Sequence, residues 1–105
     1  MFIDVKYSKN NQDQSWNVDI TGELDVSTAD KLKKELNQML DKSILSINLN
    51  MEKLEYIDST GLGVLIGVLK RIKVEEKEIT IQKPKNNIKK IFSITGLDKI
   101  FIMEG

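Results

Sequence analysis

The segment LSINLNMEKLEYIDSTGLGVLIGVLKRIK, residues 45–73, joins a predicted strand to a predicted helix. Its first seven residues alternate apolar and polar side chains, which is typical of a strand with one buried face. From Ser59 to about Lys73 the apolar residues recur at helical spacing, which predicts a helix that packs one side on the core. Alternation returns at Ile79–Gln82, so the order strand, helix, strand predicts a parallel pair joined by a helical crossover. The residues expected to face the core from this helix are Leu62, Leu65, Ile66, Leu69 and Ile72.

Two more alternating segments precede this unit, at residues 3–7 and 16–21. The polar residues between them predict a hairpin with a long turn, and Gly22 is expected to end its second strand. Ser27 is then expected to cap a helix that runs to about Asp41, because the apolar residues after it recur at helical spacing. The first half of the chain therefore adds two strands and one helix.

The end of the chain adds a short helix and a strand. Asn86 or Asn87 is expected to cap this helix, and Gly96 suits its C-terminal end. Residues 100–103 form the last predicted strand.

The order of elements, ββαβαβαβ, predicts a single α/β domain over residues 1–105. Parallel strands with helices on both faces usually consist of unbroken apolar runs. Here the strands alternate with Asn, Asp, Thr, Ser or Gln, so helices are expected mainly on one face of the sheet. Right-handed crossovers that all step in one direction produce that arrangement. The predicted sheet is mixed and has about five strands, an opening hairpin followed by parallel strands.

The composition excludes several classes of function. Sixteen basic and sixteen acidic residues give zero net charge, which argues against nucleic acid as a partner. Histidine and cysteine are absent, which excludes Ser-His triads, thiol chemistry and the usual zinc sites. No carboxylate spacing resembles a metal loop, and no phosphate-binding loop or nucleophile elbow occurs. We therefore expect a protein that is not an enzyme and has no catalytic residue, cofactor or metal.

The sequence also contains no sign of a membrane protein. No apolar run approaches the ~20 residues that span a bilayer. Residues 1–6 lack the basic region and cleavage site of a signal peptide. A cytoplasmic protein without membrane contacts is therefore expected, and its expected state is a monomer.

Ser59 lies next to Asp58 at the predicted start of the second helix. Free backbone N–H groups and the helix dipole favour an anion there, so a phosphate on this hydroxyl would leave the fold intact. Within a contact to another protein, the phosphate would cost about 3–5 kcal/mol, or about 10²–10⁴ in dissociation constant. The alternative is that Ser59 is an ordinary helix cap. Thr60 offers a second hydroxyl, which is expected to be less well presented because it is the first helical residue.

Three glycines lie within the same helix, at Gly61, Gly63 and Gly67. Each costs about 1 kcal/mol relative to alanine, so three in two turns need an explanation. One explanation is a smooth surface that another protein approaches closely, and the other is tight packing of the helix on the sheet. The pattern leaves both open. The residues of this predicted surface, on a different side from the core-facing stripe, are Gly63, Val64, Gly67, Val68 and Arg71.

Two motifs resemble those of one protein family. Residues 58–63, DSTGLG, are similar to the signature of bacterial anti-sigma-factor antagonists, which are single STAS domains. Residues 21–25, TGELD, resemble the other recurrent motif of that family, at the end of its second strand. Residues 93–97 resemble the segment before its last strand, and the whole resemblance covers about residues 18–102.

The resemblance implies a STAS fold and a partner-switching function. The unphosphorylated antagonist would bind an anti-sigma factor that is also a serine kinase, and so free a sigma factor. The kinase would phosphorylate Ser59 with ATP, the phosphoprotein would dissociate, and a metal-dependent serine phosphatase would reset it. Asp58 would help to present the hydroxyl, and Glu23 and Asp25 would lie close to it. The alternative for these acids is hydrogen bonding within their own turn, near Ser27. The residues expected at the partner contact are Glu23, Asp25, Asp58, Thr60, Gly61, Gly63, Val64, Gly67, Val68 and Arg71.

Other functions fit this sequence less well. A STAS docking module in a stressosome-like scaffold or a lipid-transport complex would need no acceptor hydroxyl beside Asp58. A small-molecule sensor or enzyme is disfavoured by the missing histidine, cysteine and phosphate loop. A receiver domain phosphorylated on Asp58 would need an acidic metal cluster near the end of the first strand, where residues 7–9 are Tyr-Ser-Lys.

Relatives commonly continue into a C-terminal helix after the last strand, whereas this sequence stops at Gly105.

Overall fold

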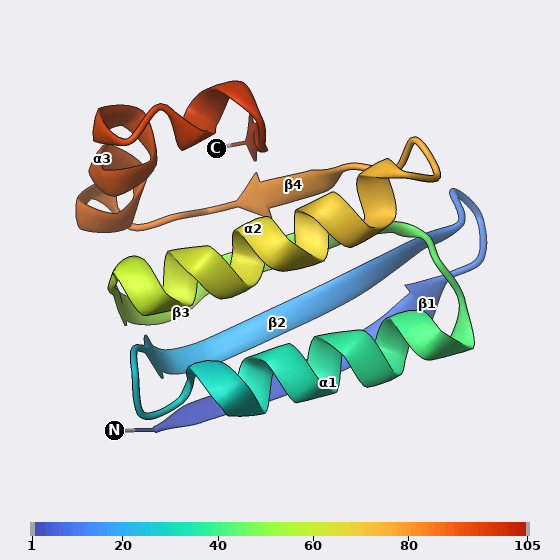
Figure 1. Ribbon diagram of the computed structural model, residues 1–105, viewed down its shortest axis with the longest axis horizontal. Helices are drawn as coiled ribbons and strands as arrows, with labels where there is room; N and C mark the ends of the chain where they lie inside the picture. The colour runs from blue at the N-terminus through green and yellow to red at the C-terminus, as the bar shows by residue number, and fades with distance from the viewer. Residues whose placement is uncertain (1, 105) are drawn as a thin grey trace.

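The computed structural model describes residues 2–104, which form one mixed sheet with helices packed on it (Figure 1). No helix in this part of the chain is long and apolar enough to cross a membrane. The elements are β1 (Ile3–Asn10), β2 (Ser15–Leu24), α1 (Ala29–Lys42), β3 (Ser46–Ile57), α2 (Ser59–Lys73), β4 (Ile79–Gln82), α3 (Asn86–Ile94), a 3-10 helix (Leu97–Lys99) and β5 (Ile102–Glu104).

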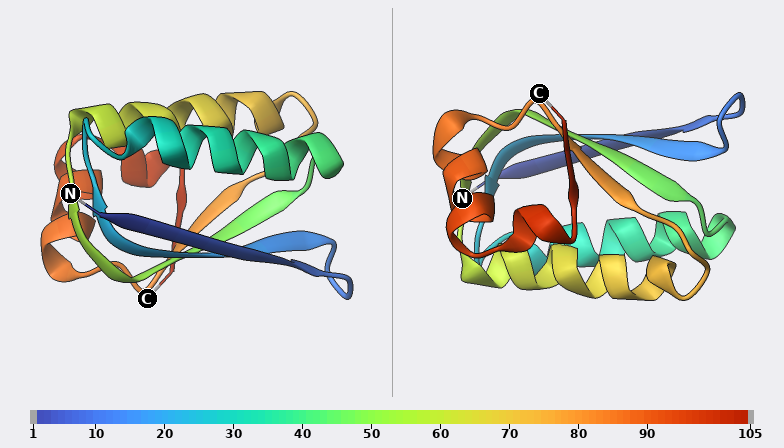
Figure 2. Two further views of the ribbon diagram at one scale, coloured as in Figure 1. Left: turned by 90° about the horizontal axis from the view of Figure 1, so that it is seen from below. Right: turned by 90° about the horizontal axis from the view of Figure 1, so that it is seen from above.

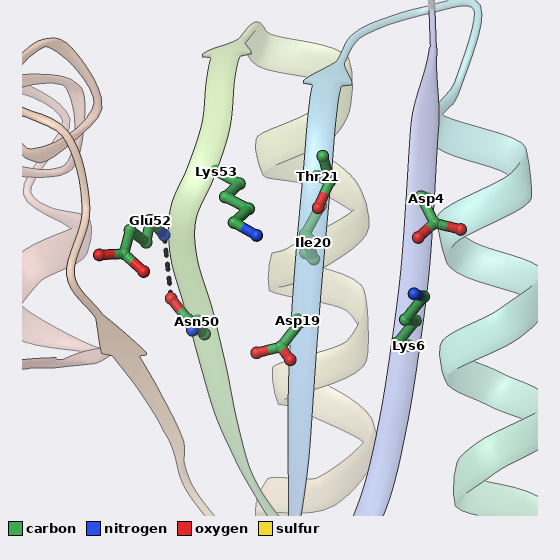
Figure 3. Close-up of a pocket in the computed structure, with 8 residues that line it drawn as sticks. All are labelled: Asp4, Lys6, Asp19, Ile20, Thr21, Asn50, Glu52 and Lys53. Atoms are coloured by element: carbon green, nitrogen blue, oxygen red, sulfur yellow. Dashed lines mark hydrogen bonds between the residues drawn. The ribbon is translucent and has the colours of Figure 1, made fainter.

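The strands lie in the order β1-β2-β3-β4-β5. β1 and β2 are antiparallel, and every later pair is parallel. The predicted hairpin followed by parallel strands is confirmed. Because each crossover steps in the same direction, α1 and α2 lie side by side on one face of the sheet, as both views in Figure 2 show. We call the opposite side of the sheet, from which the polar side chains of β1, β2 and β3 project, the open face (Figure 3).

The alternation in the strands separates core from open face. In β3, Ile47, Leu49 and Met51 are buried, whereas the asparagines between them are only half-buried. The single tryptophan, Trp16, is buried in β2, and its indole N–H donates to the carbonyl of Ser43 at 2.9 Å. Trp16 lies near the start of β2, at the opposite end of the strand from Leu24. Its fluorescence therefore reports on the core at that end of the strand.

β2 and β3 are longer than the sequence predicts. The prediction that Gly22 ends the second strand is wrong, because β2 continues to Leu24. Gly22 has a φ of 111°, and a side chain there would collide with the carbonyl oxygen of Phe2. The register between β2 and β3 shifts on either side of this glycine, so the pairing resumes at Glu23. The irregularity carries the end of β2 up to the start of α2.

Three predicted helix and strand limits also differ from the structure. Ser27 does not cap α1, since Thr28 occupies that position without a side-chain cap bond. Neither Asn86 nor Asn87 caps α3, which begins after Lys85, and the amide of Asn87 instead donates to the carbonyl of Glu55. The last strand is residues 102–104, because the 3-10 helix comes before it. Gly96, with a φ of 76°, directly follows α3 and its cap, as predicted.

Candidate partner-binding site

The start of α2 is fixed by Asp58. Its carboxylate accepts a hydrogen bond from the N–H of Gly61 at 3.0 Å, and its own N–H donates to the carbonyl of Leu24 at 3.1 Å. Asp58 is therefore the helix cap, so the alternative reading of Ser59 as the cap is wrong. Ser59 is the first helical residue and Thr60 the second, whereas the sequence predicts Thr60 as the first.

Both hydroxyls at this helix start are exposed, so burial does not distinguish Ser59 from Thr60. The first four N–H groups of a helix lack acceptors within it. Here the N–H of Asp58 donates to the carbonyl of Leu24, and the N–H of Gly61 donates to the carboxylate of Asp58. No acceptor among residues 2–104 reaches the N–H groups of Ser59 and Thr60. The side chain of Ser59 thus stands at an open, electropositive helix end that suits an anion.

Gly61 packs tightly against the end of β2. A Cβ atom on Gly61 would lie 2.5 Å from Cγ and 2.9 Å from the carbonyl oxygen of Leu24. For this glycine the packing explanation holds, because only a residue without a side chain lets α2 begin so close to β2.

Gly63 and Gly67 have no such packing reason. A Cβ atom at either position would meet nothing within 4 Å. Both line a groove of about 380 Å³ between α1 and α2. Their absent side chains keep this groove open, which supports the surface explanation for these two positions. The other residues lining the groove are Ala29, Asp30, Lys33, Asn37, Thr60, Val64 and Val68.

The burial of Val68 and of Ile66 differs from the prediction. Val68, expected on the exposed side of the helix, is buried, and Ile66, expected in the core, is only half-buried. The reason is that α2 packs on α1 as well as on the sheet, so its buried stripe is wider and turned toward α1. Val68 therefore forms the floor of the groove and not its rim.

Arg71 is held within the chain. Its guanidinium donates to the side chains of Asn37 and Asp41 in α1, both at 2.7 Å. These bonds tie α2 to α1 beyond the groove, so they help to set the spacing of its two walls. A direct contact between Arg71 and a partner stays a prediction.

The loop between β2 and α1 is built around Asp25. This residue is buried, and its carboxylate accepts bonds from the N–H of Ser27 at 2.8 Å and from the hydroxyl of Ser27 at 2.6 Å. The hydroxyl of Thr28 donates to the carbonyl of Glu23 at 2.7 Å and closes the turn. Asp25 thus hydrogen-bonds within its own turn, the alternative that the sequence left open. Glu23 remains half-buried at the end of β2.

These bonds affect the titration of Asp25. The hydroxyl of Ser27, with smaller effects from backbone N–H groups and Thr28, lowers the pKa of Asp25, although burial acts to raise it. A folded-state pKa below the unfolded one stabilises the fold above the unfolded pKa, and this contribution is lost as the pH falls through the folded pKa.

We therefore expect the free energy of unfolding to fall less below about pH 4 in Asp25→Asn than in the unmodified chain. Urea unfolding followed by Trp16 fluorescence at several pH values measures this difference. Asp98→Asn, at an exposed aspartate outside the loop, is the control and should follow the unmodified chain. Identical pH profiles for Asp25→Asn and the unmodified chain would contradict the conclusion that the fold lowers the pKa of Asp25.

The open face carries a polar depression that the sequence did not predict. Its volume is about 240 Å³, and Figure 3 shows that β1, β2 and β3 line it with side chains of both charges, Asp4, Lys6 and Lys53 among them. One bond within it joins the N–H of Glu52 to the side chain of Asn50 at 3.0 Å. Among residues 2–104 no group of three carboxylate, histidine or cysteine side chains is placed to hold a metal ion. The depression follows from the polar alternation of the strands.

Comparisons with known proteins agree on one family. The model of the STAS domain matches residues 8–104. The anti-sigma-B factor antagonist of Staphylococcus aureus is 39% identical over 95 residues, which cover 90% of this chain and 88% of that protein. A crystal structure from Thermotoga maritima, described as an anti-sigma factor antagonist, superimposes with a TM-score of 0.87 at 26% identity, covering 95% of this chain and 85% of that one. The phosphorylated form of the Bacillus cell fate determinant SpoIIAA shares the fold, with a TM-score of 0.73 at 18% identity and coverage of 95% and 90%.

Proposed function

The chain belongs to the STAS-domain family and is an anti-sigma factor antagonist, and on that premise we propose that phosphorylation of Ser59 switches off its binding to an anti-sigma factor. The observation that carries the proposal is the exposed hydroxyl of Ser59 at the first position of α2, beside the cap Asp58. The relative SpoIIAA, known in a phosphorylated form, supports the idea that this fold accepts a phosphate.

The proposed partner is an anti-sigma factor that is also a serine kinase. The γ-phosphoryl group of ATP passes to the Ser59 oxygen, the hydroxyl proton leaves, and ADP is released. A serine phosphatase reverses the modification by hydrolysing the phosphate ester. The proposed site of action is the cytoplasm, where a sigma factor works, and the proposed active form is a monomer that binds neither nucleic acid nor a membrane.

The phosphate leaves the domain folded because the exposed N–H groups of Ser59 and Thr60 and the helix dipole both favour an anion. In the complex the same two charges lie beside Asp58 in a contact from which water is excluded. An uncompensated charge in such a contact weakens binding far more than it affects the free protein.

The proposed contact surface comprises two parts. Groups at the start of α2 and on the groove face the partner directly: the exposed Ser59, Thr60, Gly63 and Gly67 and the half-buried Val64, with Glu23 and Asp58 beside them. Four residues of the expected contact act mainly by holding this surface in shape: Asp25, Gly61, Val68 and Arg71.

Mass spectrometry tests the acceptor. After incubation of the chain with ATP and the anti-sigma factor of its own organism, we expect one phosphate on Ser59. The label should be lost in Ser59→Ala and kept in Thr60→Ala, which is the matched control because both hydroxyls are exposed at the same helix end. A phosphate that persists in Ser59→Ala would contradict the proposal.

A further inference from the structure

Exposed apolar side chains gather at the same end of the molecule as Ser59. Phe2 is 58% exposed, Val26 75% and Tyr56 47%. Single exposed apolar residues are common on protein surfaces, but a group of them marks an interaction site. The other large exposed apolar residues of the described chain, Val74, Ile94, Ile100 and Ile102, are distributed over the α2–β4 turn, α3 and the β5 edge.

The topology brings Phe2 and Tyr56 to either side of Glu23. β1 runs antiparallel to β2, so its start lies beside the end of β2, where Figure 1 also shows the starts of α1 and α2. The N–H of Glu23 donates to the carbonyl of Phe2 at 2.7 Å, and the N–H of Phe2 donates to the carboxylate of Glu23 at 3.3 Å. On the other side, Glu23 lies opposite Tyr56 in the register of β2 and β3. Phe2, which directly precedes β1, Glu23 in β2 and Tyr56 in β3 thus form a row.

Tyr56 projects from the open face at this end of the sheet. Leu24 and Ile57, the next pair in register, are both buried in the core under the helices. Because side chains alternate between the two faces of a strand, Glu23 and Tyr56 point the other way. Two residues separate Tyr56 from Ser59, so the row continues directly into the start of α2.

Val26 is the third exposed apolar residue at this end of the molecule. It follows Asp25 in the loop before α1, whose hydrogen bonds leave the valine side chain in solvent. The bond from the N–H of Asp58 to the carbonyl of Leu24 holds the start of this loop against the start of α2. Exposed apolar groups therefore lie both on the open face and in the loop after β2, at the end of the sheet where α2 begins.

We propose that Phe2, Val26 and Tyr56 are apolar anchors for the anti-sigma factor, an inference that rests on the proposed function. The complementary surface of that partner is apolar, with a basic side chain that reaches Glu23 between the two aromatic rings. These residues lie at the end of the sheet where α2 begins, so a partner that covers the acceptor serine would extend over them. Aromatic anchors that exclude water are typical of the residues that dominate binding energy. They would also keep water away from a phosphate on Ser59, which makes that charge more unfavourable in the complex.

Single cysteine variants locate this contact, since the natural chain has no cysteine. Val26→Cys and Tyr56→Cys are compared with Val74→Cys, at a valine that is 84% exposed in the turn after α2. The anti-sigma factor of the same organism should slow alkylation by iodoacetamide about tenfold or more at positions 26 and 56, because a covered thiolate cannot react. The rate at position 74 should not change.

Binding measurements test the energetic role. Val26→Ala and Tyr56→Ala should each raise the dissociation constant about tenfold or more, whereas Val74→Ala and Ile102→Ala should leave it unchanged. Tyr56→Phe keeps the ring and should bind nearly as the unmodified chain does. Melting curves of all variants should agree, because the replaced side chains are exposed.

The outcomes separate this inference from the proposed function. If Ser59→Asp weakens binding but the variants at positions 26 and 56 bind and react like the controls, the anchors are overturned and the switch stands. If the unmodified chain binds no anti-sigma factor of its organism, the proposed function is overturned together with the inference.

Discussion

Ser59→Asp is expected to weaken binding of the anti-sigma factor at least about tenfold, which corresponds to about 1.4 kcal/mol. The single added charge lies beside Asp58 at the first position of α2. In the free protein a carboxylate there faces the positive end of the helix and is slightly favourable. In the complex it loses water without gaining a partner, which is unfavourable. Isothermal titration calorimetry measures the loss.

The control for this variant is Ser59→Asn, which is similar in size but carries no charge. Binding should remain within a few-fold of the unmodified chain, and the melting temperatures of both variants should match it. Equal loss of binding in the two variants would show that side-chain size matters at this position and charge does not. That result would contradict the electrostatic account.

Two glycines of the same helix should respond to alanine in opposite directions. Gly61→Ala places a methyl group 2.5 Å from Cγ of Leu24, and we expect it to destabilise the fold by about 1–3 kcal/mol. Gly67→Ala meets no neighbour and removes the flexibility of a mid-helix glycine, so it should stabilise the fold by about 1 kcal/mol. The second change should raise the melting temperature by about 4–8 °C. Urea unfolding followed by Trp16 fluorescence compares the two variants.

Gly67→Ala also tests the groove between α1 and α2. Its methyl group would enter a surface that the partner is proposed to cover, so binding should weaken although the fold is more stable. A variant that is both more stable and bound as tightly as the unmodified chain would remove the groove from the contact. Destabilisation by Gly67→Ala would contradict the geometry of the helix itself.

The sheet and its helix arrangement could be predicted because apolar alternation and crossover handedness depend on short segments. The ends of β2 and β3 could not. Their pairing continues through two register shifts, one on either side of Gly22, and the alternation of β3 is broken twice there by two exposed residues in succession, Glu52–Lys53 and Glu55–Tyr56. A pattern of period two carries no information about such a break.

The candidate site was predicted in part. The position of Ser59 at the start of α2 could be predicted because helix-start signals are local features, and its role as phosphate acceptor stays a prediction. The burial of Val68 was missed because it depends on α1, a neighbour far away in the sequence. The exposure of Phe2, Val26 and Tyr56, the proposed anchors, was not predicted for a related reason. A single sequence does not distinguish an apolar residue that packs in the core from one that remains in solvent to meet a partner.

Calorimetry with the chain phosphorylated stoichiometrically on Ser59, titrated into the anti-sigma factor next to the unmodified chain, tests the switch most directly. We predict a dissociation constant about 10²–10⁴ higher for the phosphorylated form, with the melting temperature of the free chain unchanged. Equal binding of the two forms would contradict the account, and so would a loss of binding that accompanies unfolding of the phosphorylated chain.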